Sequence, residues 1–144
     1  MRDSGYDDGK AGLATGYRSG TTIAEPIDMS VPHAAGGLYS TVLDMHRWDK
    51  ALYSEKLVPP DLLATMFEPK VQGAGPGAGY GFGVGIGTHA GKPWVFHGGG
   101  IDGFVTWYGR HPDDRLAIIL LANRESVAPY DRLDQSITDL VLDR

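Results

Sequence analysis

A histidine followed by three glycines, at positions 97–100, is the stretch of this chain whose residue types could do chemistry. It follows the apolar run Pro93–Phe96 and precedes a second apolar run, Phe104–Tyr108. We therefore expect a strand that ends at the histidine, with a glycine-rich turn after it. Glycines bring bare backbone N–H groups close to a ligand, here beside one titratable side chain. Such a site can bind an anion or stabilise an oxyanion.

The elements that must position this stretch follow from hydrophobic periodicity. An apolar stripe from Leu38 to Leu52 has helical spacing, and Thr41 and Asp44 resemble a capping box. Pro59-Pro60-Asp61 can open a second helix. The sequence predicts an α+β fold whose helices span about 41–53, 61–67 and 129–142. The antiparallel strands of its sheet are expected at about 80–87, 92–97, 104–110 and 115–122.

Glycine alternates with large apolar residues throughout the segment 79–87. Period-two alternation is typical of a strand, and the five glycines indicate that something packs very closely against one face. The run Leu116–Ala122 is apolar throughout, which predicts a strand buried on both faces.

The chain of 144 residues has the size of one domain. We interpret 1–144 as a single domain or fragment. Residues 1–37 form an irregular segment that wraps over the rest, 38–68 are helical, and 79–144 hold the sheet and the C-terminal helix.

Composition excludes several function classes. The net charge of −5 argues against binding to nucleic acid or to an anionic membrane surface. No apolar run approaches the roughly 18 residues that span a bilayer, and the first eight residues do not resemble a signal peptide. The absence of cysteine excludes disulfides and thiolate chemistry and leaves the compartment open.

Four motifs in order resemble the C-terminal part of the serine β-lactamase-like hydrolases: class C β-lactamases, D-Ala-D-Ala carboxypeptidases and related esterases. The motifs are Ala35–Met45 (AGGLYSTVLDM), Tyr80–Gly85 (YGFGVG), the HGG at 97–99, and the hairpin that runs from Gly103-Phe104 to Leu121-Ala122-Asn123. The resemblance covers nearly the whole chain. It implies a partial β-lactamase/transpeptidase-like fold, and a family whose members are often extracytoplasmic and sometimes cytoplasmic.

The resemblance also implies roles for the histidine and the glycines. His97 would orient or polarise the carboxylate of the substrate or the family's tyrosine. The N–H of Gly100 would form one arm of the oxyanion hole, and Gly98 and Gly99 would line the substrate site. A donor of this kind is worth about 3 kcal/mol in the transition state.

The other two motifs of that family, S-x-x-K and Y-x-N, are missing here. None of the seven serines has a lysine three residues later, and Ser54-Glu55-Lys56 is off by one. Tyr17-Arg18-Ser19 reads as Y-x-S, but it lies after the position of the family's tyrosine. The first hypothesis is therefore the C-terminal half of a serine hydrolase for amides, β-lactams or esters, inactive alone and able to self-associate through exposed apolar surface.

Two alternatives remain. One is a non-catalytic module that binds small carboxylates; the other is a stand-alone esterase with an unconventional nucleophile such as Ser19 or Ser40. No metal site is expected from the spacing of the five histidines, and we expect no cofactor, because no phosphate loop occurs. His33, His46, His89 and His111 are expected at the surface or in turns.

Overall fold

The computed structural model describes residues 1–9, 11–73, 78–125 and 129–142. Its centre is a six-stranded antiparallel sheet in the order β10-β9-β8-β7-β6-β5, so that every strand pairs with its neighbour in the chain. The strands are β5 (Val71–Gln72), β6 (Gly79–Tyr80), β7 (Gly85–His89), β8 (Lys92–Ile101), β9 (Phe104–His111) and β10 (Leu116–Ala122). The short 3₁₀ helix η1 (Pro112–Asp114) connects β9 to β10.

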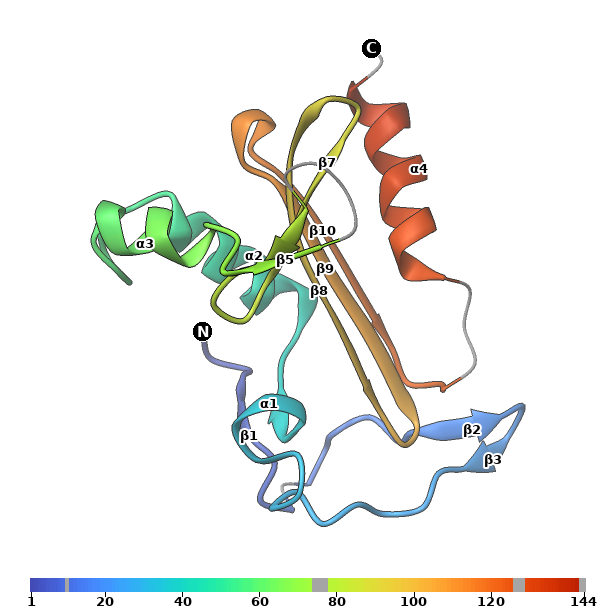
Figure 1. The fold of residues 1–144 in the computed structure, drawn as a ribbon. Coiled ribbons are helices and arrows are strands. Elements are labelled where there is room, and N and C mark those ends of the chain that lie inside the picture. The colour runs from blue at the N-terminus through green and yellow to red at the C-terminus, as the bar shows by residue number, and fades with distance from the viewer. Residues whose placement is uncertain (10, 74–77, 126–128, 143–144) are drawn as a thin grey trace.

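Helices cover both faces of this sheet. The helix α4 (Tyr130–Leu142) lies along one face, and α2 (Val42–Leu52) and α3 (Pro60–Met66) lie on the other side (Figure 1). Trp107 and Tyr108 are neighbours on β9 and therefore point to opposite faces. Trp107 reaches Asp134 of α4, and Tyr108 reaches Asp49 of α2. The α+β fold and the three helices agree with the sequence analysis to within one residue at each end.

The start of α2 is set by a side chain. The hydroxyl of Thr41 accepts a hydrogen bond from the N–H of Asp44 at 3.2 Å, as expected for an N-cap. Leu52, at the other end of the helix, is buried, whereas Val42 remains 46% exposed. The helix thus packs on the sheet by its C-terminal half.

The N-terminal 39 residues form short elements around one end of the sheet. These are β1 (Gly5–Tyr6) paired with β4 (Leu38–Tyr39), the hairpin of β2 (Tyr17–Ser19) and β3 (Thr22–Ile23), and the single turn α1 (His33–Gly36). Tyr17 joins this segment to the sheet, because its N–H donates to Asn123 O at 3.1 Å and its carbonyl accepts from Glu125 N–H at 3.0 Å. Among the described residues no helix has the length and apolar character needed to cross a membrane.

The glycine-alternating segment 79–87 is a hairpin and not one strand. The N–H of Gly81 donates to Val84 O at 2.8 Å, and Gly83 has φ +76°. A positive φ is readily adopted only by glycine, so one glycine of the alternating pattern, Gly83, is a turn residue and not a strand residue. Tyr80 on β6 is consequently paired with Gly85 on β7. Close packing does occur: a Cβ at Gly81 would collide with the carbonyl oxygen of Met66.

Strand β10 also differs from the expectation. It is the edge strand of the sheet, and only Ile118 of its seven residues is buried. The continuous apolar run predicted a strand buried on both faces, but Leu121 is 41% exposed. The run is apolar because α2 and α4 contact its two faces, and its outer edge has no strand partner among the described residues apart from the contact of Tyr17 beyond its end.

Candidate active site

His97 lies in the second half of β8, on the face of the sheet that α2 covers. Its cross-strand neighbour is Tyr108, whose hydroxyl donates to Asp49 Oδ1 at 2.6 Å. Paired residues on adjacent strands point to the same face, so the imidazole is on the α2 side. His97 and the three glycines that follow are exposed. The imidazole is therefore accessible to a ligand.

The three glycines do not form a turn; they continue β8 to Ile101. The turn is instead made by Asp102 and Gly103, where Gly103 has φ +84°. The expected strand end at 97 is therefore wrong by four residues. Extended backbone is allowed for glycine as for any residue, and pairing with β9 from Gly98↔Trp107 to Ile101↔Phe104 holds the segment straight.

The pairing of β8 with β7 stops just before this stretch. The last pair is Gly85↔Phe96, while β9 continues along the other side. From His97 onward β8 thus has one paired edge and one edge without a strand partner among the described residues. We call the latter the free edge of β8.

The register fixes which N–H groups point to the free edge. Two residues connect Ile101 to Phe104, so this pair must be the hydrogen-bonded kind. Alternation then directs the N–H of Gly99 toward β9. The N–H groups of Gly98 and Gly100 point the opposite way, to the free edge. Two exposed backbone donors on alternate residues thus lie beside His97.

The nearest partner of His97 is Tyr80, which comes from the short strand β6. The Tyr80 hydroxyl is 2.8 Å from His97 Nε2, and the two rings meet edge-to-face with centroids 6.0 Å apart. The sequence placed Tyr80 in an expected strand and in the motif Tyr80–Gly85, and it predicted no role for Tyr80 in the site. The hairpin turn within 79–87 is what brings it to the histidine.

A buried polar cluster supports β9 directly beside the site. The carboxylate of Asp49 accepts the Tyr108 hydroxyl and lies 3.3 Å from Arg110 Nε, and all three residues are buried. Burial, followed by the hydrogen bond to Asp49, raises the pKa of Tyr108, so its phenol stays protonated. The cluster ties α2 to the strand opposite His97. The sequence offered no signal for it beyond polar residues within apolar runs.

The two candidate serines have unsuitable surroundings. Ser40 Oγ is 2.8 Å from Ser4 Oγ, and Ser4 donates to Asp44 at 2.9 Å. Burial raises the pKa of Asp44, but hydrogen bonds from the backbone of Asp3 and from Arg47 and Ser4 outweigh it and lower the pKa to about 2. Such a carboxylate is a poor general base. Ser19 is exposed on β2, and no basic side chain hydrogen-bonds to it in the described part of the chain.

His111 is buried and not at the surface as expected. It lies under α4, where its Nε2 is 3.0 Å from Thr138 Oγ1. Burial lowers the pKa of His111 below its ordinary value of 6.5. Within the described residues, no group of three or more His, Cys, Asp or Glu side chains could hold a metal ion.

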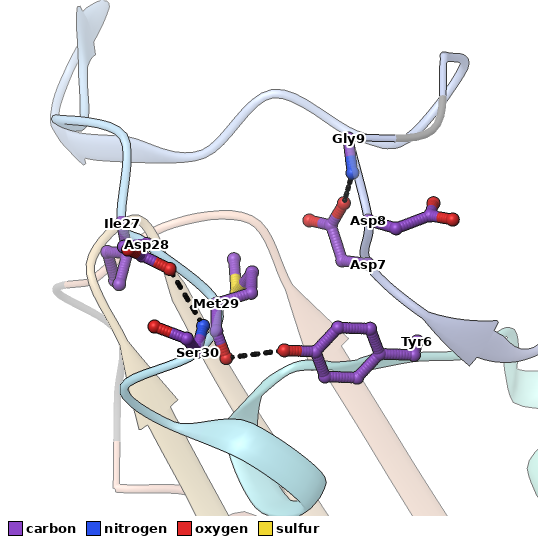
Figure 2. A pocket seen from close by; sticks show the side chains of 8 residues that line it. All are labelled: Tyr6, Asp7, Asp8, Gly9, Ile27, Asp28, Met29 and Ser30. Atoms are coloured by element: carbon purple, nitrogen blue, oxygen red, sulfur yellow. Dashed lines mark hydrogen bonds between the residues drawn. The ribbon is translucent and has the colours of Figure 1, made fainter.

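A separate cavity of about 410 Å³ lies in the N-terminal segment (Figure 2). Its carboxylates are engaged by local backbone: Asp7 accepts from Gly9 N–H at 3.0 Å and Asp28 from Ser30 N–H at 2.9 Å. The hydroxyl of Tyr6, on the other side of the cavity from Asp28 (Figure 2), donates to Met29 O at 2.8 Å. The two aspartate contacts are those of local turns, and none of the three contacts involves the stretch at 97–100.

Comparison with known proteins gives a consistent family. The family model described as Beta-lactamase matches residues 2–142. No curated protein matches this chain significantly.

Several solved structures have the same fold. An octameric penicillin-binding protein homologue from Pyrococcus abyssi matches with a TM-score of 0.83, at 23% identity, over 100% of this chain and 35% of its own. A penicillin-binding protein from Bacillus halodurans has a TM-score of 0.71 at 24% identity, over 95% of this chain and 44% of its own. A D-amino acid amidase from Ochrobactrum anthropi SV3, complexed with D-phenylalanine, has a TM-score of 0.72 at 20% identity. The match covers 100% of this chain and 50% of the amidase chain. The chain thus spans between a third and a half of the length of these proteins.

Proposed function

Because this chain belongs to the Beta-lactamase family, we propose that it supplies the oxyanion side of a serine hydrolase active site. The reaction is the cleavage of an amide, β-lactam or ester through an acyl-enzyme. The observation that carries this proposal is the free edge of β8, where the Gly98 and Gly100 N–H groups lie beside His97. Exposed donors on a rigid strand suit a carbonyl oxygen that becomes negative.

In this mechanism the Gly100 N–H donates to the substrate carbonyl oxygen. Attack by a serine hydroxyl converts that carbonyl into a tetrahedral oxyanion, and the donor strengthens as the charge develops. The proton of the serine passes to a base that, like the serine, the rest of the family fold supplies. Collapse of the intermediate breaks the bond to the leaving group, which takes this proton, and water then hydrolyses the acyl-enzyme. His97 binds the substrate carboxylate or polarises the tyrosine that family members carry.

The attacking serine belongs to the part of the family fold outside these 144 residues. The chain has no S-x-x-K, and the matched structures are two to three times its length. Ser40 reaches the carboxylate of Asp44 only through the hydroxyl of Ser4, and the pKa of that carboxyl is about 2, so it is a poor base for the serine proton at neutral pH. We therefore propose that the chain alone does not turn over substrate.

Intact mass spectrometry tests this after incubation with a reactive β-lactam and, separately, with a fluorophosphonate. The expected result is no covalent adduct with either reagent. A stoichiometric adduct on one serine, lost in His97→Ala, would instead make the chain a working esterase and overturn the assignment of the nucleophile. Ser19→Ala and Ser40→Ala would then identify the residue.

A second candidate function, binding of small carboxylates without turnover, is favoured by one observation. His97 and both outward N–H groups belong to this chain, so binding needs no serine. We expect acetyl-D-alanyl-D-alanine to shift the amide resonances of Gly98 and Gly100 in a ¹⁵N NMR titration. The shifts should vanish in His97→Ala. A flat titration of the wild-type protein would remove this function.

Self-association is the remaining part of the proposal. Two copies would pair through β10 in the manner of an added strand, because its outer edge has no strand partner along its length among the described residues. The matched homologue from Pyrococcus abyssi is octameric. Short, uncharged edge strands with exposed leucine favour such contacts.

A further inference from the structure

The contact between Tyr80 and His97 has a direction that follows from the chemistry of its two groups. The atoms that meet are the Tyr80 hydroxyl and His97 Nε2, at 2.8 Å. A neutral imidazole has one nitrogen that donates and one that accepts. A phenol O–H is the more acidic donor and an imidazole nitrogen the more basic acceptor, so Tyr80 donates and Nε2 accepts. The ring proton of His97 then resides on Nδ1.

Tyr80 is held in place independently of His97. Its carbonyl accepts from Lys70 N–H at 2.9 Å, which joins it to the segment before β5. On the other side, Phe82 N–H donates to Met66 O at 3.0 Å, at the end of α3. The backbone that carries the phenol is therefore held on both sides, so the phenol can orient a side chain on another strand.

We propose that Tyr80 is a positioning residue that locks His97 as the Nδ1–H tautomer and so makes Nδ1–H the donor offered to the ligand. The second part rests on the proposed function of the free edge of β8. The first part does not, because the tautomer is a property of the unliganded protein. In this arrangement the phenol occupies Nε2, so the ligand can meet only the other ring nitrogen.

Long-range ¹H–¹⁵N correlation spectra of the imidazole at alkaline pH read the tautomer directly. Wild-type protein should show a protonated Nδ1 and an unprotonated Nε2 at His97, with the resonances assigned by their loss in His97→Asn. In Tyr80→Phe the ring should change to a majority of the Nε2–H form, which free imidazole side chains prefer. A wild-type Nε2–H form, or an unchanged tautomer in Tyr80→Phe, would overturn the proposal.

Tyr6→Phe is the matched control. Tyr6 is 42% exposed and Tyr80 41%, and each hydroxyl makes one described hydrogen bond, that of Tyr6 to Met29 O. The control removes the same atom at similar exposure and should leave the His97 tautomer unchanged. A change as large as that in Tyr80→Phe would show that the tautomer responds to general loosening, and would also overturn the proposal.

Ligand binding separates the two parts. The side-chain amide of asparagine can place an N–H near Nδ1, whereas glutamine places it near Nε2. With acetyl-D-alanyl-D-alanine as the probe, we expect His97→Asn to retain more affinity than His97→Gln, and Tyr80→Phe to weaken binding roughly threefold to tenfold, the value of one hydrogen bond. The opposite order of the two amide variants would overturn the donor assignment. If wild-type protein does not bind the probe, the proposed function fails, while the tautomer measurement still decides the role of Tyr80.

Discussion

Neighbouring glycines on β8 point their N–H groups to opposite edges, which makes proline a selective probe. Proline removes the backbone donor and is tolerated only where that donor is not part of the ladder. We expect Gly100→Pro to keep the fold and to abolish the amide shifts caused by acetyl-D-alanyl-D-alanine. Gly99→Pro should lose more stability than Gly99→Ala, because both add a Cβ 2.5 Å from Thr106 Oγ1 but only proline removes the N–H that points to β9. Chemical denaturation measures the stability of these variants, and the same titration measures their binding. A loss of stability in Gly100→Pro as large as that in Gly99→Pro would contradict the outward direction of the Gly100 N–H.

Asp44 contributes to the loss of stability of this fold in acid. Its pKa is about 2 in the folded protein, against 3.8 for an ordinary aspartate. A lowered pKa gives stability that is present above about pH 4 and is lost as the pH falls from 3.8 toward 2, because the unfolded state takes up the proton first. The free energy of unfolding, measured with urea at each pH, should therefore fall less steeply in this interval for Asp44→Asn than for the wild-type protein. Identical slopes would show that the contacts of Asp44 with Ser4 and Arg47 do not persist in solution.

At the scale of elements, one carboxylate connects α4 to the sheet. Asp134 Oδ2 accepts the indole N–H of Trp94 at 3.0 Å and of Trp107 at 2.7 Å, and it is fully buried. We expect Asp134→Ala to cost about 3 kcal/mol, because two donors lose their acceptor away from water. Urea denaturation measures this, and Asp134→Asn should lose less because one acceptor remains.

Asp131→Ala is the control on the same helix. Asp131 is exposed in the first turn of α4, where an acidic side chain contributes less than about 1 kcal/mol through the helix dipole. If Asp134→Ala is no more destabilising than this control, the indole contacts do not stabilise the docking of α4.

The elements differ in how far the sequence determines them. Helix α2 was predictable because its cap at Thr41 and its apolar stripe are local signals. The segment 79–87 was misread because glycine at alternate positions fits a strand and a turn equally well, and only the positive φ of Gly83 distinguishes them. His97 was found from its glycines, whereas Tyr80 required the pairing of β6 with β7. The Asp49 and Asp134 contacts join residues 59 and 40 positions away along the chain, which no local pattern reports.

At the scale of the whole molecule, the proposed self-association depends on the outer edge of β10, which has no strand partner along its length among the described residues. The N–H groups of Ala117, Ile119 and Leu121 point outward, because those of the residues between them face β9. We expect Leu121→Lys to reduce self-association, since a charged side chain on an edge strand opposes pairing. Analytical ultracentrifugation across a range of protein concentrations measures the degree of self-association. Leu140→Lys on α4, where Leu140 is 71% exposed, is the control and should leave association unchanged. A wild-type protein that stays monomeric at every concentration would contradict the proposal.

The strictly sequential pairing of β5 to β10 has a consequence for the order in which the molecule is assembled. Each hairpin closes a short loop at low entropic cost, so the sheet can form strand by strand. The contact of Asn123 with Thr15 spans 108 positions, so closing its loop costs more entropy and we expect it to form after the sheet. In native-state hydrogen exchange, we therefore expect the N-terminal 39 residues to open independently of the sheet. The amides of β8 and β9 should stay protected until the whole sheet unfolds.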